Sequence, residues 1–182
     1  MALEFTTSYL QDSVAVFHQY KKLAERAMDQ LTEEQFTAVL DPEMNSVALI
    51  VKHVSGNLRS RWTDFLTTDG EKPDRDRDAE FEAPPATREE VRALWEQGWS
   101  TLFATLESLT DRDLTATVTI RGEALSAMQA LNRSIAHTAS HVGQIVLLAK
   151  HLNSAQWKPL SVPRGQSAAY TQKVYSGEAS QR

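Results

Sequence analysis

The stretch SAMQALNRSIAHTASHVGQIVLLAKHL, residues 126–152, decides the fold of this chain and carries its clearest chemical signal. Its apolar side chains recur at intervals of three and four residues, which places them on one face of a helix. These residues are Met128, Leu131, Ile135, Val142, Ile145, Ala149 and Leu152. Ser126 is a suitable N-cap because its hydroxyl can accept a hydrogen bond from the first turn. The stretch therefore predicts a long amphipathic helix whose apolar face needs partners.

An earlier segment shows the same periodicity near the start of the chain. Its apolar stripe begins at Leu10 and continues to Leu31. Directly afterwards, Thr32 and the residues that follow match a capping box, which predicts a short helical turn before Asp41-Pro42 ends it.

Two more amphipathic helices are expected in the middle of the chain. One is capped by Asn45 or Ser46 and continues to about Leu66. The other begins at a second capping box, formed by Thr87 and Glu90. Four long helices with apolar faces predict an all-α fold, a four-helix bundle.

The connections between these helices have different compositions. Residues 67–86 are rich in Gly, Asp, Arg and Pro and lack any period, so we expect a solvated crossover loop between the second and third helices. A crossover of this length permits neighbouring helices to run parallel as well as antiparallel. The β-branched stretch Leu114–Ile120, with Gly122 as a turn residue, predicts a small hairpin before the last helix.

The size of the chain favours one domain. We expect 182 residues to form a single domain, 1–182, with the bundle at about residues 5–152. The tail, 153–182, contains Trp157, Leu160 and Val162, which predict that it packs back on the bundle. A polar stretch after Gly165 is compatible with another helix.

Composition excludes several kinds of partner. The formal net charge is -5 and the basic residues form no block, so nucleic acid is not expected as a partner. The longest apolar runs have five residues each, Val47–Val51 and Ile145–Ala149, against the ~20 that a membrane span requires. The start, Met1–Phe5, does not resemble a secretory signal, so a cytoplasmic location is the default expectation.

The absence of cysteine bounds the chemistry of the chain. There is no disulfide, no thiolate ligand and no thiol nucleophile among its 182 residues. Any thiol chemistry would use a thiol from a cosubstrate.

His137 and His141 are the clearest pair of candidate metal ligands. They stand four residues apart in the predicted last helix, so both imidazoles lie on the same face and can reach one ion. His53 lies beside the apolar face of the second helix and is the candidate third ligand. A helical histidine pair also occurs without any ligand role, so the spacing alone leaves both interpretations open. His18 and His151 are expected to be uninvolved, because His151 lies about 15 Å further along the helix than His141.

The sequence around these histidines resembles a known superfamily. Residues 46–53, SVALIVKH, together with HTASH at 137–141, resemble the DinB/YfiT-like superfamily of four-helix-bundle proteins. The stretches 117–123, 136–150 and 161–166 are similar to one uncharacterised branch of it. The resemblance extends along nearly the whole chain.

The resemblance implies an up-down-down-up bundle that forms a homodimer. It also implies that one histidine of the second helix, His53, and the pair His137 and His141 hold a divalent cation. Some members are similar to transferases or isomerases that use a low-molecular-weight thiol, whose pKa the metal lowers.

The surroundings of the predicted site are less distinctive. We find no carboxylate next to the histidine pair that could orient a ring or act as a general base. The polar neighbours that could surround the ion or contact a substrate are Asn57, Arg61, Gln144 and Arg164.

Two classes of function follow from these observations. The first is a metal-dependent enzyme in which zinc, nickel, iron or manganese activates water or a low-molecular-weight thiol. Its reaction on a small molecule would be that of a hydrolase, a transferase or an isomerase. The second is a non-catalytic small-molecule-binding or interaction module with a vestigial histidine cluster. Converging ring nitrogens beside an open cavity favour the enzyme, and splayed or sealed rings favour the module.

Overall fold

The last long helix forms where its periodicity predicts. In the computed structural model, which describes residues 7–180, α5 comprises Ala127–Asn153. Ser126 caps it as expected, because its hydroxyl accepts a hydrogen bond from the Gln129 backbone N–H at 3.1 Å. The Gln129 side chain in turn accepts from the Ser126 N–H at 2.8 Å, which completes a capping box.

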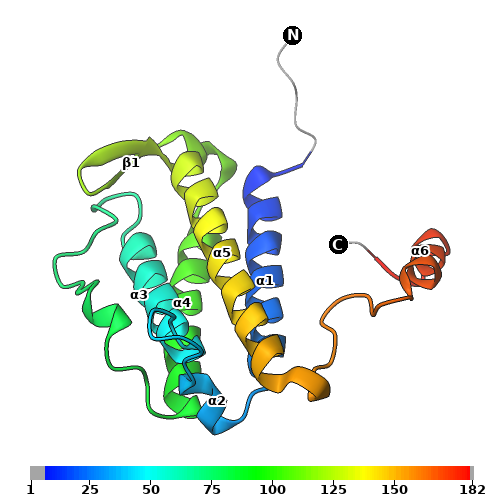
Figure 1. Cartoon of the computed structure of the whole chain (residues 1–182). Coiled ribbons are helices and arrows are strands. Elements are labelled where there is room, and N and C mark those ends of the chain that lie inside the picture. The colour runs from blue at the N-terminus through cyan, green and yellow to red at the C-terminus, as the bar shows by residue number, and fades with distance from the viewer. Residues whose placement is uncertain (1–6, 181–182) are drawn as a thin grey trace.

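Three more long helices lie beside α5 in the described part of the chain (Figure 1). They are α1 (Tyr9–Met28), α3 (Val47–Trp62) and α4 (Arg88–Ser108), with the short α2 (Glu33–Thr37) after α1. Helix α1 packs mainly on α5, and α3 packs mainly on α4. The fold is therefore mostly helical, as predicted. The predicted bundle start at residue 5 and the segment Met1–Phe5 lie outside the described residues.

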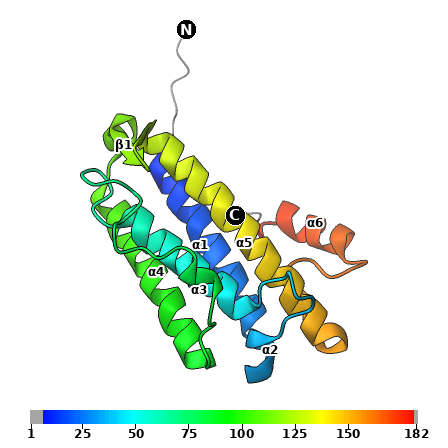
Figure 2. The ribbon, with the colours of Figure 1, turned by 60° about the vertical axis from the view of Figure 1, so that its left-hand side comes forward.

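The four long helices run in two opposite directions. The ribbon shows α3 and α4 running the same way, with the long crossover returning the chain from the end of one to the start of the other (Figure 2). Helices α1 and α5 run opposite to them. None of the described helices is both long enough and apolar enough to cross a membrane.

An aromatic cluster fills the core between the long helices. The Phe17 ring meets Trp62 and Trp99 edge-on, with centroids 6.3 and 6.1 Å away, and Trp95 meets Trp99 at 5.3 Å. All four rings are buried. Helices α3 and α4 approach closely because Gly98 has no side chain: a Cβ there would lie 2.7 Å from the Ser55 Cα. Edge-on contacts of this kind stabilise the core beyond the burial of apolar area.

The second predicted helix ends earlier than expected. It stops at Trp62 rather than near Leu66, because Thr63 is extended and Asp64 has a φ of 48°. A positive φ cannot continue a right-handed helix. The chain turns here into the crossover loop, which we define as residues 63–87.

The predicted hairpin is confirmed and is attached to the crossover loop. Strands β1 (Thr117–Ile120) and β2 (Glu123–Ser126) pair antiparallel, and Arg121 and Gly122 form the turn with φ values of 57° and 77°. Asp69 of the loop accepts hydrogen bonds from both turn N–H groups, each at 2.8 Å. The Gly70 N–H also donates to the Thr119 carbonyl. The hairpin and the loop therefore hold each other in place.

The tail beyond α5 contacts the helices only at its beginning. A short 3-10 helix, Ser154–Gln156, leads to Trp157 and Leu160, which pack against the core. Arg26 donates to the Leu160 carbonyl at 2.9 Å. Helix α6 (Ser167–Tyr175) has no buried residue and stands apart from the long helices in both views (Figures 1 and 2).

Candidate metal centre

The structure brings His53, His137 and His141 together. His53 projects from α3, and the other two project from successive turns of α5. One nitrogen from each ring lies within 4.8 Å of the other two. The His53 and His137 Nε2 atoms are 3.1 Å apart. His53 is buried, whereas His137 and His141 are half-buried. The three rings therefore converge on one point that remains accessible from outside.

This donor set fits a divalent cation. Two nitrogens bound tetrahedrally to one ion at ~2.0–2.1 Å are separated by about 3.3 Å. The 3.1 Å between His53 and His137 is close to that value, and the His141 nitrogen lies within 4.8 Å of both. Three imidazoles leave at least one coordination position for another ligand, which is characteristic of reactive sites.

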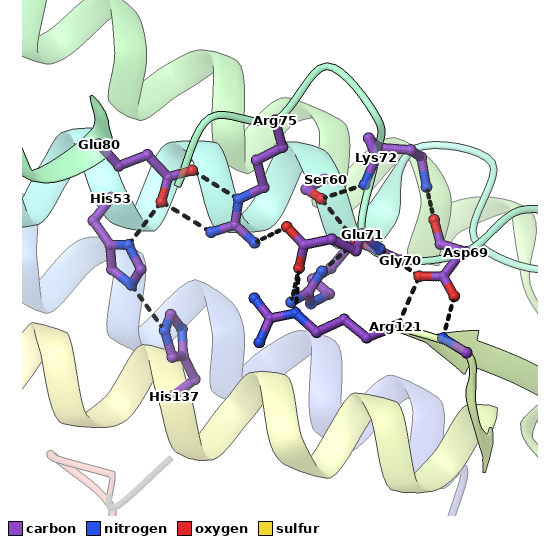
Figure 3. A network of polar contacts seen from close by, with 12 residues as sticks. His53, Ser60, Asp69, Gly70, Glu71, Lys72, Arg75, Glu80, Arg121 and His137 are labelled. Atoms are coloured by element: carbon purple, nitrogen blue, oxygen red, sulfur yellow. Dashed lines mark hydrogen bonds and ion pairs between the residues drawn. The ribbon is translucent and has the colours of Figure 1, made fainter. Parts of the chain in front are cut away.

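A carboxylate orients His53, contrary to the sequence-based expectation. The His53 Nδ1–H donates to Glu80 Oε2 at 2.8 Å, so the lone pair of Nε2 faces His137 (Figure 3). Such a partner fixes the tautomer of a ligating histidine and makes the ring a better donor. The expectation failed because Glu80 follows His53 by 27 residues and belongs to the crossover loop.

Glu80 is itself held firmly. Arg75 donates to both of its oxygens, from Nε at 2.8 Å and from Nη2 at 2.9 Å. Burial alone would raise the pKa of the Glu80 carboxyl, but the hydrogen bonds from His53 and Arg75 outweigh burial and lower that pKa. Glu80 therefore remains a carboxylate at neutral pH and is a strong acceptor for His53.

Gly56 gives Glu80 the space to reach His53. It lies one helical turn after His53 on α3, and a Cβ at this position would approach Glu80 Oε1 to 2.2 Å. Glycine within a helix is unfavourable by roughly 0.5–1 kcal/mol relative to alanine. The absence of a side chain here is explained by the carboxylate that packs against the helix.

The ion-pair network continues from Glu80 to the hairpin. Arg75 Nη1 lies 3.5 Å from Glu71 Oε1, and Glu71 Oε2 accepts from Arg61 Nη2 at 3.0 Å and from Arg121 Nε at 2.9 Å. Figure 3 shows this chain of charges leading from His53 through the crossover loop to the hairpin turn. The expectation of a solvated loop was therefore wrong for part of it. The side chains of Arg75 and Glu80 are buried against α3.

The pair on α5 is held in the neutral form that a metal requires. Burial lowers the pKa of His137 to about 3, and the adjacent His141 and His53 add to this effect. Burial also lowers the pKa of His141, although its hydrogen bond to Gln144 opposes the shift. That bond runs from His141 Nδ1 to Gln144 Oε1 at 2.8 Å and leaves Nε2 available as a ligand.

The other predicted site residues occupy different places. Asn57 and Arg61 line a pocket beside His53 and His137, and Gln144 contacts His141. Arg164 is exposed in the tail and does not line this pocket. The Phe81 ring, which the sequence did not indicate, stacks on His53 with centroids 4.6 Å apart. His18 stacks on Phe103 instead, and His151 is exposed.

The residues that sequence reasoning missed all lie in or beside the crossover loop. Glu80, Arg75 and Glu71 have no helical period that would relate them to the histidines. One signal was present, namely Gly56 inside an otherwise regular amphipathic helix. A glycine at such a position indicates close approach of another group.

Fold and site together define a class: a mostly helical protein in which histidines from two long helices form a three-nitrogen candidate metal centre. The chain belongs to the family described as protein of unknown function DUF1572, whose model matches residues 4–166. The match includes the three histidines and the whole crossover loop and ends just before α6. Searches of the curated proteins and of the solved structures found no match.

Proposed function

We propose that this protein is a metal-dependent enzyme of the DinB/YfiT-like superfamily, built as an up-down-down-up four-helix bundle. His53, His137 and His141 bind one divalent ion, namely zinc, nickel, iron or manganese. The observation that carries the proposal is the orientation of His53. Its Nδ1–H is bound to a buried carboxylate while its Nε2 faces His137 at 3.1 Å. A histidine that only filled core space would not need a carboxylate held in turn by an arginine.

A divalent ion at this site would supply Lewis-acid chemistry and lower the pKa of a coordinated water or thiol. The chain provides the surroundings for it. Glu80 orients His53, Phe81 covers the His53 ring, and the pocket beside His137 admits a small molecule.

Our choice of reaction class rests on the side chains that line the pocket beside the histidines. Among residues 7–180 no carboxylate lines the pocket, and both oxygens of Glu80 are engaged by Arg75 and His53. A hydrolase that activates water usually needs a free general base. We therefore favour a transferase or isomerase, and the resemblance to thiol-dependent members of the superfamily supports a low-molecular-weight thiol as its cosubstrate.

The alternative is a non-catalytic small-molecule-binding module in which the histidine cluster is vestigial. The same absence of a general base from the pocket favours it. The two alternatives differ in metal content, because a vestigial cluster has no need to retain an ion. The homodimer implied by the resemblance stays a prediction.

Elemental analysis of protein expressed without a histidine tag tests the proposal. We expect close to one divalent ion per chain in the wild type and its loss in His137→Ala. His151→Ala removes an exposed histidine from the same helix and should retain the ion. Wild-type protein that takes up no ion when each metal is offered would favour the binding module. If the metal is retained, the loaded protein should then be assayed with a panel of low-molecular-weight thiols and electrophiles.

A further inference from the structure

A positively charged pocket adjoins the histidine cluster. Its volume is about 140 Å³, and His53 and His137 form part of its lining. Five arginines also line it, from α3, the crossover loop, the hairpin turn and α5: Arg61, Arg75, Arg77, Arg121 and Arg133. Neither aspartate nor glutamate is among the lining residues. In a chain with a net charge of -5, this is a local concentration of positive charge.

Only part of this charge is neutralised. Arg61, Arg75 and Arg121 pair with the carboxylates of Glu71 and Glu80. The side chains of Arg77 and Arg133 form no hydrogen bond or ion pair with any of residues 7–180. Of the five guanidinium groups in the lining, three are therefore paired with two carboxylates, and two form no ion pair within the described residues.

Another carboxylate of the crossover loop, Asp69, is not part of the pocket lining. Asp69 is committed to the backbone, where it accepts hydrogen bonds from the N–H groups of Glu71, Arg121 and Gly122. Its role is to hold the loop against the hairpin, which brings Arg121 to the edge of the pocket.

Arg75 provides a second, independent indication of a ligand. Its side chain is only 5% exposed, and its Nη1, although it lies 3.5 Å from Glu71 Oε1 as an ion pair, has no hydrogen bond within the described residues. A buried donor that has an ion-pair partner but no hydrogen-bond acceptor is not fully satisfied, and in native proteins such a group usually has a ligand, ion or water to bind. An anion entering the pocket that Arg75 lines would supply that partner.

We propose that this pocket binds the oxyanion group, a carboxylate or a phosphate, of a small substrate beside the metal. This inference rests on the proposed function and names the substrate class. Guanidinium groups present paired N–H donors that match the geometry of carboxylate and phosphate oxygens. Asn57 and Ser134 add polar atoms, and Ile120 and Ala130 offer a short apolar surface for the carbon skeleton. The anion is held by the arginines, and the reacting part of the molecule points to the three histidines.

Titration calorimetry with inorganic phosphate tests the pocket. The measurement is made on metal-free and on metal-loaded protein, and the metal content of each sample is recorded. Removal of a charged hydrogen-bond donor typically weakens binding by about tenfold. We expect that loss in Arg77→Gln and in Arg133→Gln, and roughly the product of the two losses in the double variant. Both side chains are exposed, so the variants should fold normally. Arg112→Gln removes an exposed arginine outside the pocket and should bind phosphate as the wild type does.

The outcomes separate this inference from the proposed function. Phosphate binding that weakens in the two pocket variants but not in Arg112→Gln, in both metal states, supports the anion pocket. Protein that carries its metal but does not bind phosphate, or binds it equally in all variants, overturns the anion pocket alone. Arginine-dependent phosphate binding in protein that never takes up metal overturns the metal centre and leaves the anion pocket standing.

Discussion

Two irregular segments of this chain share some features of sequence and differ in what they do. The crossover loop, 63–87, and the tail, 154–180, are both polar and contain proline, glycine and arginine. The loop buries Arg75 and Glu80 against α3 and orients His53. The tail contacts the helices through Trp157 and Leu160 and then leaves them, and its α6 buries nothing.

The two segments differ in charge and in how much of it is buried: 11 of the 25 residues of the loop are charged, against 4 of the 27 residues of the tail. Taking a charged side chain out of water is costly unless it is paired and hydrogen-bonded, so buried ion pairs mark positions where geometry is controlled. The loop contains such pairs within reach of the histidines. The one charged side chain of α6, Lys173, is exposed. The family match likewise includes the entire loop and ends before α6.

The largest effect is expected when the loop loses its contact with the histidine. Glu80→Gln replaces a charged acceptor by a neutral amide, and loss of such a partner typically lowers metal affinity by about 10- to 100-fold. A competition titration with a metal-binding dye measures this. Glu82→Gln, two residues away and exposed, is the matched control and should bind metal normally. Equal affinity in both variants would show that the loop does not tune the site.

A smaller change at Gly56 tests the same contact from the helix side. Gly56→Ala introduces a methyl group 2.2 Å from Glu80 Oε1, so the carboxylate must move away from Arg75 and His53. We expect metal affinity to fall by about tenfold, toward the lower limit for loss of an orienting partner. The substitution should have almost no further effect in a Glu80→Gln background, because the two changes disrupt one contact.

Two other glycines serve as controls for this prediction. Gly98→Ala would press on the Ser55 backbone and should lower the melting temperature without altering metal affinity. At Gly143 in α5 a Cβ would have no neighbour within 4 Å, so Gly143→Ala should stabilise the protein by roughly 0.5–1 kcal/mol. An affinity loss at Gly98 as large as that at Gly56 would mean that the site responds to general destabilisation.

The pH dependence of the stability of the metal-free protein tests whether His137 is neutral in the folded state. Burial lowers the pKa of His137 to about 3, whereas a histidine in the unfolded chain titrates near ~6.5. Below ~6.5 the unfolded state therefore binds a proton that the folded state does not, and stability decreases as the pH falls. Between about pH 7 and pH 5, the melting temperature of the wild type should drop more than that of His137→Gln. His151→Gln should follow the wild type.

The smallest effect is expected from the tail. Deletion of residues 167–182 removes α6, which buries no side chain, so the free energy of unfolding should change by less than about 0.5 kcal/mol. Metal affinity should not change. Urea denaturation and the same dye titration measure both quantities. A marked loss of either would mean that the tail, like the loop, contributes to the site.

Local sequence patterns predicted much of this structure. Periodicity and capping residues indicated the four long helices, and Ser126 and Thr87 cap α5 and α4 as expected. The β-branched stretch with Gly122 indicated the hairpin. The helical spacing of His137 and His141, with His53 on the flank of another helix, predicted that these residues would meet.

The remaining features depend on contacts that local patterns do not encode. Glu80 reaches His53 only because the loop folds back over α3, and Asp69 fixes that path by binding the hairpin turn. The early end of α3 depends on the positive φ of Asp64. Arg75 and Glu80 were expected to be solvated because most charged side chains in loops are, and only their pairing makes burial favourable.

A crystal structure of the protein grown with zinc tests the central claim most directly. We expect one ion bound by nitrogens of His53, His137 and His141 at ~2.0–2.1 Å, with Glu80 still accepting from the His53 Nδ1–H. An ion that bypasses any of the three histidines, or a site that stays empty while zinc binds elsewhere on the surface, would contradict it.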